Sequence, residues 1–187
     1  MELAPQTPLE IRSQIWRGLS RAVHDKHHSW RTPVLSTLAV DGSVNSRTVV
    51  LRGADELAST LMVYTDSRSA KFAELRVNST ALFVFWSQRL HWQLRVKVNV
   101  SLLSAGPQVE NLWEKVKQSA AAKDYISLSA PGSMLTKSPD SSALPQSNDH
   151  HFAVLSAQVE EIDWLELSTN GHRRARFTST LWEWLTP

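Results

Sequence analysis

Short strand-like segments joined by turns fill the chain between residues 34 and 102. In the clearest of them, residues 92–102, Leu and Val alternate with Gln, Arg, Lys and Asn, which is the period of a half-buried strand. Asp41-Gly42, between two other segments, is typical of a hairpin turn. Because consecutive strands joined by tight turns pair antiparallel, the sequence predicts a mainly β, α+β fold built around a barrel.

Helices and one long loop surround the predicted strands. Apolar residues recur at helical spacing after Thr7, a predicted N-cap, and Pro8. Residues 124–151 are rich in Ser, Pro, Asp and Asn and predict a long loop of the kind that often serves as a lid. We expect a single domain over residues 1–187, with an N-terminal helical segment within 1–30. The expected helices are 8–27, 67–78 and 107–123, and the expected strands are 34–40, 44–51, 61–64, 81–86, 92–102, 152–157, 161–167 and 172–177, followed by a short tail at 181–185.

The composition excludes several classes of function. The 187 residues contain no cysteine, so disulfides, thiolate metal sites and cysteine nucleophiles are excluded. The formal net charge of +2 is too small to predict nucleic-acid binding. The N-terminus lacks the pattern of a secretory signal, and no apolar run is long enough to span a bilayer. We therefore expect a cytoplasmic protein with neither nucleic acid nor a membrane as its partner.

Cationic and hydroxyl side chains follow the predicted strands in the pattern that a cofactor phosphate requires. Arg47 and Lys71 could bind a phosphate dianion, with Thr65 and Ser69 as hydroxyl donors. Residues 67–71 also open a predicted helix, whose unpaired backbone N–H groups attract phosphate. The simpler alternative, that a serine caps the helix and Lys71 is solvated, explains each residue taken alone but not their combination.

A flavin ring has its own requirements, which a second set of residues could meet. The backbone of residues 49–51 and the side chain of Gln93 could bond the edge of a flat ring. No Gly-x-Gly-x-x-Gly follows a strand, and the chain has no P-loop and no Gly-x-Ser-x-Gly. Flavin mononucleotide (FMN) is therefore the first hypothesis for the cofactor.

Other candidate groups have simpler interpretations. His24 and His28, at i and i+4, would suit a metal, but they lie at a helix end, where the dipole attracts imidazolium. The carboxylates at positions 160, 161 and 163 indicate a solvated strand edge more than a glycosidase pair. The basic run 172–176 is better suited to an anion or cofactor contact than to nucleic acid.

The order and spacing of the motifs resemble the pyridoxamine 5′-phosphate oxidase family, over about residues 30 to 187. That family has an FMN-binding split β-barrel fold and forms homodimers with two flavins at the subunit interface. The C-terminal Arg176-Phe177, with Trp182 beyond it, also resembles the end of those proteins. The motifs that carry the resemblance are Arg47-Thr48-Val49-Val50-Leu51-Arg52, Tyr64-Thr65, Ser69-Ala70-Lys71 and Gln93-Leu94-Arg95.

The resemblance implies roles for individual residues. Arg47 and Lys71 would bind the FMN phosphate, residues 49–51 would lie along the ring, Gln93 would reach the flavin from the partner side of the interface, and Arg176 would contact the flavin. No catalytic side chain is assigned and no metal is expected. The complete expected cofactor-binding set is Arg47, Thr48, Val49, Val50, Leu51, Arg52, Tyr64, Thr65, Arg68, Ser69, Lys71, Gln93 and Arg176.

The departures from the family pattern concern the substrate more than the flavin. The second phosphate arginine of the family is Ala70 here, and Arg68 is expected to substitute for it. Arg52 replaces the substrate-binding lysine. Residues 125–133 keep the tyrosine and proline of the family's substrate-phosphate segment but have no arginine, and residues 172–174 replace its Arg-Leu-His motif.

We therefore expect an FMN-dependent oxidoreductase in which a small-molecule substrate gives a hydride to flavin N5. The first alternative is a non-catalytic flavin-binding or carrier protein, which the missing substrate arginine favours. The second alternative is a heme- or F420-handling relative on the same barrel.

Overall fold

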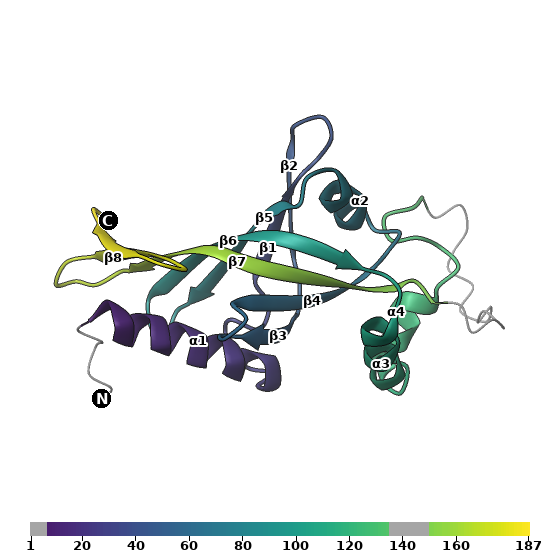
Figure 1. Ribbon diagram of the computed structural model, residues 1–187, viewed down its shortest axis with the longest axis horizontal. Coiled ribbons are helices and arrows are strands. Elements are labelled where there is room, and N and C mark those ends of the chain that lie inside the picture. Colours follow the sequence, from purple (N-terminus) through teal and green to yellow (C-terminus); the bar gives the residue numbers. More distant parts are fainter. Residues whose placement is uncertain (1–6, 135–149) are drawn as a thin grey trace.

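Within the residues that the computed structural model describes, 7–134 and 150–187, nine β-strands form one sheet with four α-helices around it (Figure 1). The helices are α1 (Pro8–His24), α2 (Ala70–Val77), α3 (Pro107–Val116) and α4 (Lys123–Ile126), with the 3₁₀ turn η1 (Ala120–Ala122). The strands are β1 (Val34–Leu38), β2 (Val44–Thr48), β3 (Leu51–Asp55), β4 (Thr60–Asp66), β5 (Thr80–Ser87), β6 (Trp92–Leu103), β7 (Phe152–Glu166), β8 (Arg173–Thr178) and β9 (Trp182–Leu185).

The sheet is antiparallel throughout and follows the order β2-β1-β5-β6-β7-β4-β3, with β8 and β9 added beside β7. The long strand β7 pairs with β6, with β4 through its first half and with β8 through its second half. The sequence predicted two strands here, 152–157 and 161–167, which is wrong. The chain continues as one strand past a register shift opposite Lys97 and Val98, where Glu160 is the extra residue of a bulge.

The predicted strand 44–51 is also wrong, because the chain leaves the ladder at Val49 and Val50. It passes there from β2, at one end of the sheet, directly to β3, at the other end. Three peptide steps separate Thr48 from Leu51 and span at most about 11 Å. The two ends of the sheet must therefore approach each other, which curls the sheet into a barrel. No pairing joins β2 to β3 in the described part of the chain, so the barrel is split.

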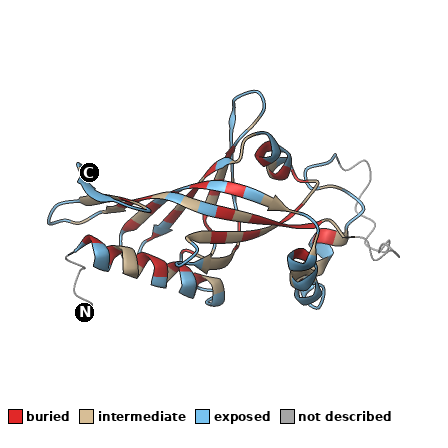
Figure 2. Cartoon of the chain, in the orientation of Figure 1, coloured by how far each residue is buried: buried red, intermediate tan, exposed pale blue. Residues whose placement is uncertain are grey.

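Helices complete the core on both sides of the sheet. Helix α1 begins with a reciprocal capping box between Thr7 and Glu10 and packs on β3. Buried positions recur along α1 and along β6 and β7 (Figure 2). A second cluster of buried residues joins α3 and α4 to the first residues of β7. Its members are Val109, Val116, Tyr125, Phe152 and Val154.

The remaining helices and the C-terminal tail differ in extent from the prediction. Helix α1 ends at His24 instead of residue 27, and α2 begins only at Ala70, after the N-cap Ser69. The predicted helix 107–123 ends at Val116, and η1 and α4 follow it, so the loop expected from 124 begins later. The tail at 181–185 contains strand β9. Residues 135–149 of the predicted loop lie outside the described residues. No described helix is long and apolar enough to cross a membrane.

Candidate functional site

Four of the predicted phosphate ligands converge where β2, β4 and α2 meet. Thr65, near the end of β4, and Ser69, the N-cap of α2, are both only 3% exposed, and their hydroxyl oxygens lie 3.1 Å apart. Ser69 makes no side-chain capping bond to the helix, and its hydroxyl is hydrogen-bonded to the Thr65 hydroxyl. Lys71 lies in the first turn of α2, and its ammonium group and the Arg47 guanidinium are close enough to repel each other.

Lys71 has a positive charge that its surroundings do not neutralise. None of the described residues accepts a hydrogen bond from its ammonium group or forms an ion pair with it. Burial and then the charge of Arg47 lower the pKa of Lys71, while Asp66 and Glu74 act weakly in the opposite direction. An anion bound beside Lys71 would remove this penalty.

Arg47 is held in place by a network that the sequence did not reveal. Its Nη2 lies 3.1 Å from Glu74 Oε2, and its Nη1 donates to Thr37 Oγ1. Thr37 and Asn45 in turn donate to Glu74 at 2.5 and 2.6 Å. Burial acts to raise the pKa of Glu74, but the hydrogen bonds from Thr37 and Asn45 and the Arg47 charge together lower it. The only signal for this network was the alternation of Thr37, Asn45 and Arg47 on one face of a hairpin.

Arg68, expected to replace the missing phosphate arginine, is bound to an acid. Its Nε and Nη2 donate to the two oxygens of Asp66 at 3.1 and 2.7 Å, and its Nη1 lies 3.3 Å from the carbonyl of Leu128. Asp66 is 4% exposed. This bidentate pair is neutral as a whole, so a phosphate role for Arg68 stays a prediction.

The predicted ring contacts come from the segment that joins β2 to β3. Thr48 is exposed at the end of β2, whereas Leu51 is completely buried, so only the backbone of Leu51 can face a ligand. The N–H groups of Val49 and Leu51 donate to the carbonyls of Pro33 and Arg31. The N–H of Val50, between them, donates to no described residue.

Arg52 and Tyr64 lie together on the side of the second core cluster. The Arg52 guanidinium lies 5.5 Å from the centre of the Tyr64 ring, which packs edge-on against Phe152. Burial raises the pKa of both Tyr64 and Tyr125, and in each case the Arg52 charge opposes it. Arg52 therefore faces aromatic hydroxyls that keep their protons at neutral pH.

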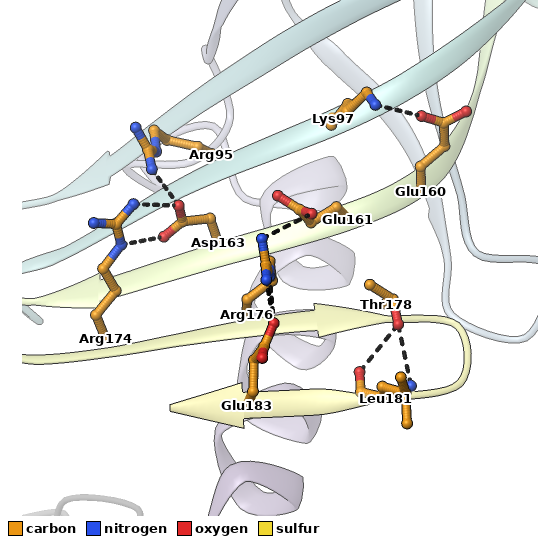
Figure 3. A network of polar contacts seen from close by, with 10 residues as sticks. All are labelled: Arg95, Lys97, Glu160, Glu161, Asp163, Arg174, Arg176, Thr178, Leu181 and Glu183. Atoms are coloured by element: carbon orange, nitrogen blue, oxygen red, sulfur yellow. Dashed lines mark hydrogen bonds and ion pairs between the residues drawn. The ribbon is translucent and has the colours of Figure 1, made fainter. Parts of the chain in front are cut away.

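Gln93 and Arg176 lie elsewhere in the chain. Gln93, on β6, pairs with Trp86 and Leu165. Arg176 donates to Glu183 and lies 4.0 Å from Glu161 (Figure 3). Its strand β8 is at the opposite end of the molecule from α2 (Figure 1). One chain therefore does not bring these two residues to the phosphate cluster.

The expectation that Asp163 belongs to a solvated edge is wrong, because β7 is an inner strand. Asp163 is 7% exposed and accepts hydrogen bonds from Arg174 Nε and Nη2 at 3.0 and 2.8 Å and a further one from Arg95 (Figure 3). In the basic run 172–176, Arg174 and Arg176 lie on one face of β8 as predicted. Both are already paired with carboxylates. The described residues contain no cluster of His, Cys, Asp and Glu that could hold a metal ion.

Known proteins match the chain in sequence. Residues 13–104 match the family model of the FMN-binding domain of pyridoxamine 5′-phosphate oxidase. A pyridoxine/pyridoxamine 5′-phosphate oxidase of Thermosynechococcus vestitus is 31% identical over 102 residues, which are 54% of this chain and 46% of that protein. Pyridoxine/pyridoxamine 5′-phosphate oxidase 2 of Arabidopsis thaliana is 25% identical over 150 residues, 73% of each protein. The chain thus spans about half the length of the first relative and more of the second.

Solved structures match the fold over nearly the whole chain. A pyridoxamine 5′-phosphate oxidase-related, FMN-binding protein of Nostoc punctiforme has a TM-score of 0.73 at 20% identity, covering 98% of this chain and 100% of that one. PhzG of Burkholderia lata, solved with tetrahydrophenazine-1-carboxylic acid, has a TM-score of 0.71 at 19% identity, covering 100% of this chain and 95% of that one. At these identities the likeness concerns the fold alone, and it confirms the predicted split barrel.

Proposed function

Residues 13–104 belong to the pyridoxamine 5′-phosphate oxidase-like family of FMN-binding domains, and we propose that the chain binds FMN with the phosphate between Arg47 and Lys71. The observation that carries this proposal is the half-buried Lys71 ammonium, which has no anionic partner among the described residues. The Thr65 and Ser69 hydroxyls beside it are buried and can donate to the same anion. Two cations and two hydroxyls match the needs of a phosphate dianion.

The flavin ring would lie along the segment that joins β2 to β3. The unused N–H of Val50 is placed to donate to the polar edge of the ring, because its neighbours on both sides are tied to other backbone carbonyls. Leu51 and Val49 are buried and fix this segment to the core. Bound FMN would supply hydride acceptance at N5, and the chain would contribute binding, orientation and exclusion of water. On this basis the protein is an FMN-dependent oxidoreductase acting on a small molecule.

A homodimer would complete the site. Gln93 pairs with Leu165, which in turn pairs with Arg174 of β8, the strand that also carries Arg176. Because β8 lies away from α2 (Figure 1), a second copy would supply Gln93 and Arg176 to the flavin. Mixing subunits tests this point. Lys71→Met and Gln93→Ala each damage both sites of their own homodimer, but a mixed dimer has one intact site. Mixing the unfolded variants and refolding them together should restore FMN binding that neither variant has alone. If mixing restores nothing, the two residues act in one chain and the shared site is refuted.

The phosphate assignment is tested by comparing FMN with riboflavin, which lacks the phosphate. Loss of one charge-assisted hydrogen bond costs about 1.5–3 kcal/mol, which is roughly a 10- to 150-fold loss of affinity. Lys71→Met should weaken FMN binding by this factor and leave riboflavin binding unchanged. Lys117→Met is the matched control, because it removes an exposed lysine that pairs with Glu114 at the end of α3. Equal FMN affinity in Lys71→Met and wild type would overturn the assignment.

A flavin carrier without turnover is the second candidate function. Two observations favour it: Arg176 is bound to Glu183, and residues 125–133 contain no arginine for a substrate phosphate. Steady-state assay of the FMN-loaded protein with pyridoxamine and pyridoxine 5′-phosphates separates the two candidates. Reduction of the flavin by either compound supports the oxidase, and stable oxidised flavin with both compounds supports the carrier. The visible spectrum of the purified protein separates both from a heme protein, which has a Soret band.

A further inference from the structure

A second cationic pocket lies away from the proposed flavin site, between α1 and the turn that joins β5 to β6. Its volume is about 160 Å³, and its cationic lining consists of Arg17, Arg21, His28 and Arg89. Arg17 and Arg21 are one turn apart on α1, so they extend from the same helix face. Arg89 reaches the pocket from the β5–β6 turn. Helix α1 with the loop that follows it, and the distant β5–β6 turn, therefore bring cations to one hollow.

These arginines differ from most others in the chain, because no described carboxylate pairs with them. None of the three guanidinium groups makes a hydrogen bond or an ion pair with a described residue. The helix dipole at the C-terminus of α1 stabilises the unpaired charge of Arg21, which is in the last turn, but it does not reach Arg17 or Arg89. The arginines that do pair with carboxylates are Arg47, Arg68, Arg95, Arg173, Arg174 and Arg176.

The pKa of His28 indicates that these charges lie close together, and its ring supplies a further hydrogen-bond donor. Burial lowers the pKa of His28, Asp25 opposes this, and Arg21 and Arg89 lower it further, so both guanidinium groups act on one ring. His28 Nδ1 accepts a hydrogen bond of 3.1 Å from the backbone N–H of Trp30. The neutral ring therefore carries its hydrogen on Nε2, which is the nitrogen left to donate to a ligand.

The floor of the pocket is rigid. Trp30 is 1% exposed and stacks on Trp92, with ring centres 6.5 Å apart. Its ring also presses on the backbone of α1, where a β-carbon at Gly18 would lie 2.4 Å from Trp30 Cζ3. The cations therefore lie over a well-packed wall that is in place before any ligand binds, in which Trp30 is a buried support and not a contact surface.

We propose that this pocket binds the phosphate group of a small phosphate monoester, at a site separate from the flavin. A dianion can accept from several guanidinium groups at once, and Arg is the side chain best shaped for such contacts. The volume of the pocket limits the organic part of the ligand to a small group. Asp25, whose charge acts on His28, accepts a hydrogen bond from the backbone N–H of His27, and its single negative charge leaves the three guanidinium groups in excess.

The test is isothermal titration of the FMN-saturated protein with inorganic phosphate and with phenyl phosphate at fixed ionic strength. Saturating FMN keeps the probes from the Arg47 and Lys71 cluster. We expect one binding event per chain, weakened about tenfold or more by Arg17→Gln, Arg21→Gln or Arg89→Gln. Arg12→Gln, on the same helix but outside the pocket, makes the same change in net charge and should leave binding unchanged. These arginines are exposed, so the variants should fold normally, which circular dichroism checks.

The outcomes separate the proposal from its alternatives. Tighter binding of phenyl phosphate identifies a monoester whose organic part also contacts the pocket, and equal binding identifies the phosphate group alone as the part that is recognised. Absence of saturable binding overturns the proposal. Equal weakening by Arg12→Gln and the pocket variants also overturns it, because binding would then reflect diffuse charge. If the protein holds no FMN, the titration is run on Lys71→Met, whose flavin-phosphate cluster is disabled while this pocket is intact.

Discussion

Lys71→Met should change stability and cofactor affinity in opposite directions. In the flavin-free protein, Lys71 is half-buried, is repelled by Arg47, and has no described hydrogen-bond partner. A buried polar group left without a partner costs about 1–3 kcal/mol. Methionine keeps the length of the side chain and removes the charge, so the flavin-free variant should be more stable than wild type by about 1 kcal/mol, because the site is open to a ligand and partly solvated. The same variant should lose FMN affinity, because the phosphate is then short of one cation.

The pH dependence of the stability difference separates an effect of the Lys71 charge from an effect of packing, since packing alone would not change with pH. The pKa of Lys71 is lowered in the folded protein, so the unfolded chain binds more protons above that pKa. The stability of flavin-free wild type should therefore rise relative to Lys71→Met as pH rises from the folded pKa toward the unfolded value of about 10.4. Binding of FMN favours the charged amine, so binding in that alkaline range should take up protons in wild type but not in the variant.

Urea denaturation of the flavin-free proteins at pH 7 and pH 9.5 measures the stability difference. Calorimetry of FMN binding in two buffers of different ionisation enthalpy measures the proton uptake. Lys117→Met is the control for loss of an exposed lysine. If Lys71→Met is less stable than wild type when both proteins are free of flavin, then Lys71 stabilises the fold and is not an unpaired charge that an anion would neutralise. In that case the central argument for the phosphate cluster fails.

Three further perturbations test the fold around the site. Arg47→Met and Glu74→Gln, made singly and together in flavin-free protein, form a double-mutant cycle. Urea denaturation of these variants should give a coupling energy of about 1.5–3 kcal/mol between Arg47 and Glu74. Additive effects would mean that the network does not hold Arg47. Gly18→Ala should destabilise the protein by about 1–3 kcal/mol in thermal unfolding, because the added carbon meets Trp30 at 2.4 Å. Asp163→Asn should cost about 1–3 kcal/mol at pH 7, since its arginine partners hold the pKa of the carboxyl low despite burial. Because the pKa of Asp163 is lower in the folded than in the unfolded chain, that cost should start to shrink as pH falls below the unfolded pKa of about 3.9 and should disappear below the folded pKa; an equal cost at pH 3 and at pH 7 would contradict this.

The sequence predicted the fold class because local patterns determine it. Period-two alternation in residues 92–102 and the Asp41-Gly42 turn depend only on neighbours in the chain. The break at Val49 and Val50 could not be predicted in this way, because residues 44–51 contain no glycine or proline and read as one strand. The break is imposed by closure of the sheet, which depends on the order of all its strands. The single strand β7 was missed for the converse reason, since a bulge interrupts its alternation without ending the pairing.

The candidate site was predictable to the extent that its residues share short motifs. Thr65, Ser69 and Lys71 lie within one strand-to-helix connection, so their convergence follows from local structure. Glu74 could not be predicted as the partner of Arg47, because the contact requires the β1–β2 hairpin to lie against α2. Pairing across the sheet likewise decided the surroundings of Asp163, whose burial depends on strands at both of its sides.

The segment that crosses from β2 to β3 determines where the positive charges of Arg47 and Arg52 lie in the site. Arg47 precedes the crossing and points to Lys71 and α2, whereas Arg52 follows it and points to Tyr64 on the other core cluster. The segment between them is fixed to the core by Val49 and Leu51. Arg47 and Arg52 are five residue steps apart, so their Cα atoms are separated by at most about 17 Å. A flat ligand lying along this segment thus meets a cation at each end. If FMN binds as proposed, the four residues at the phosphate end would specify the cofactor, and the Arg52 end, beside Tyr64 and Tyr125, is where selectivity for a substrate would arise.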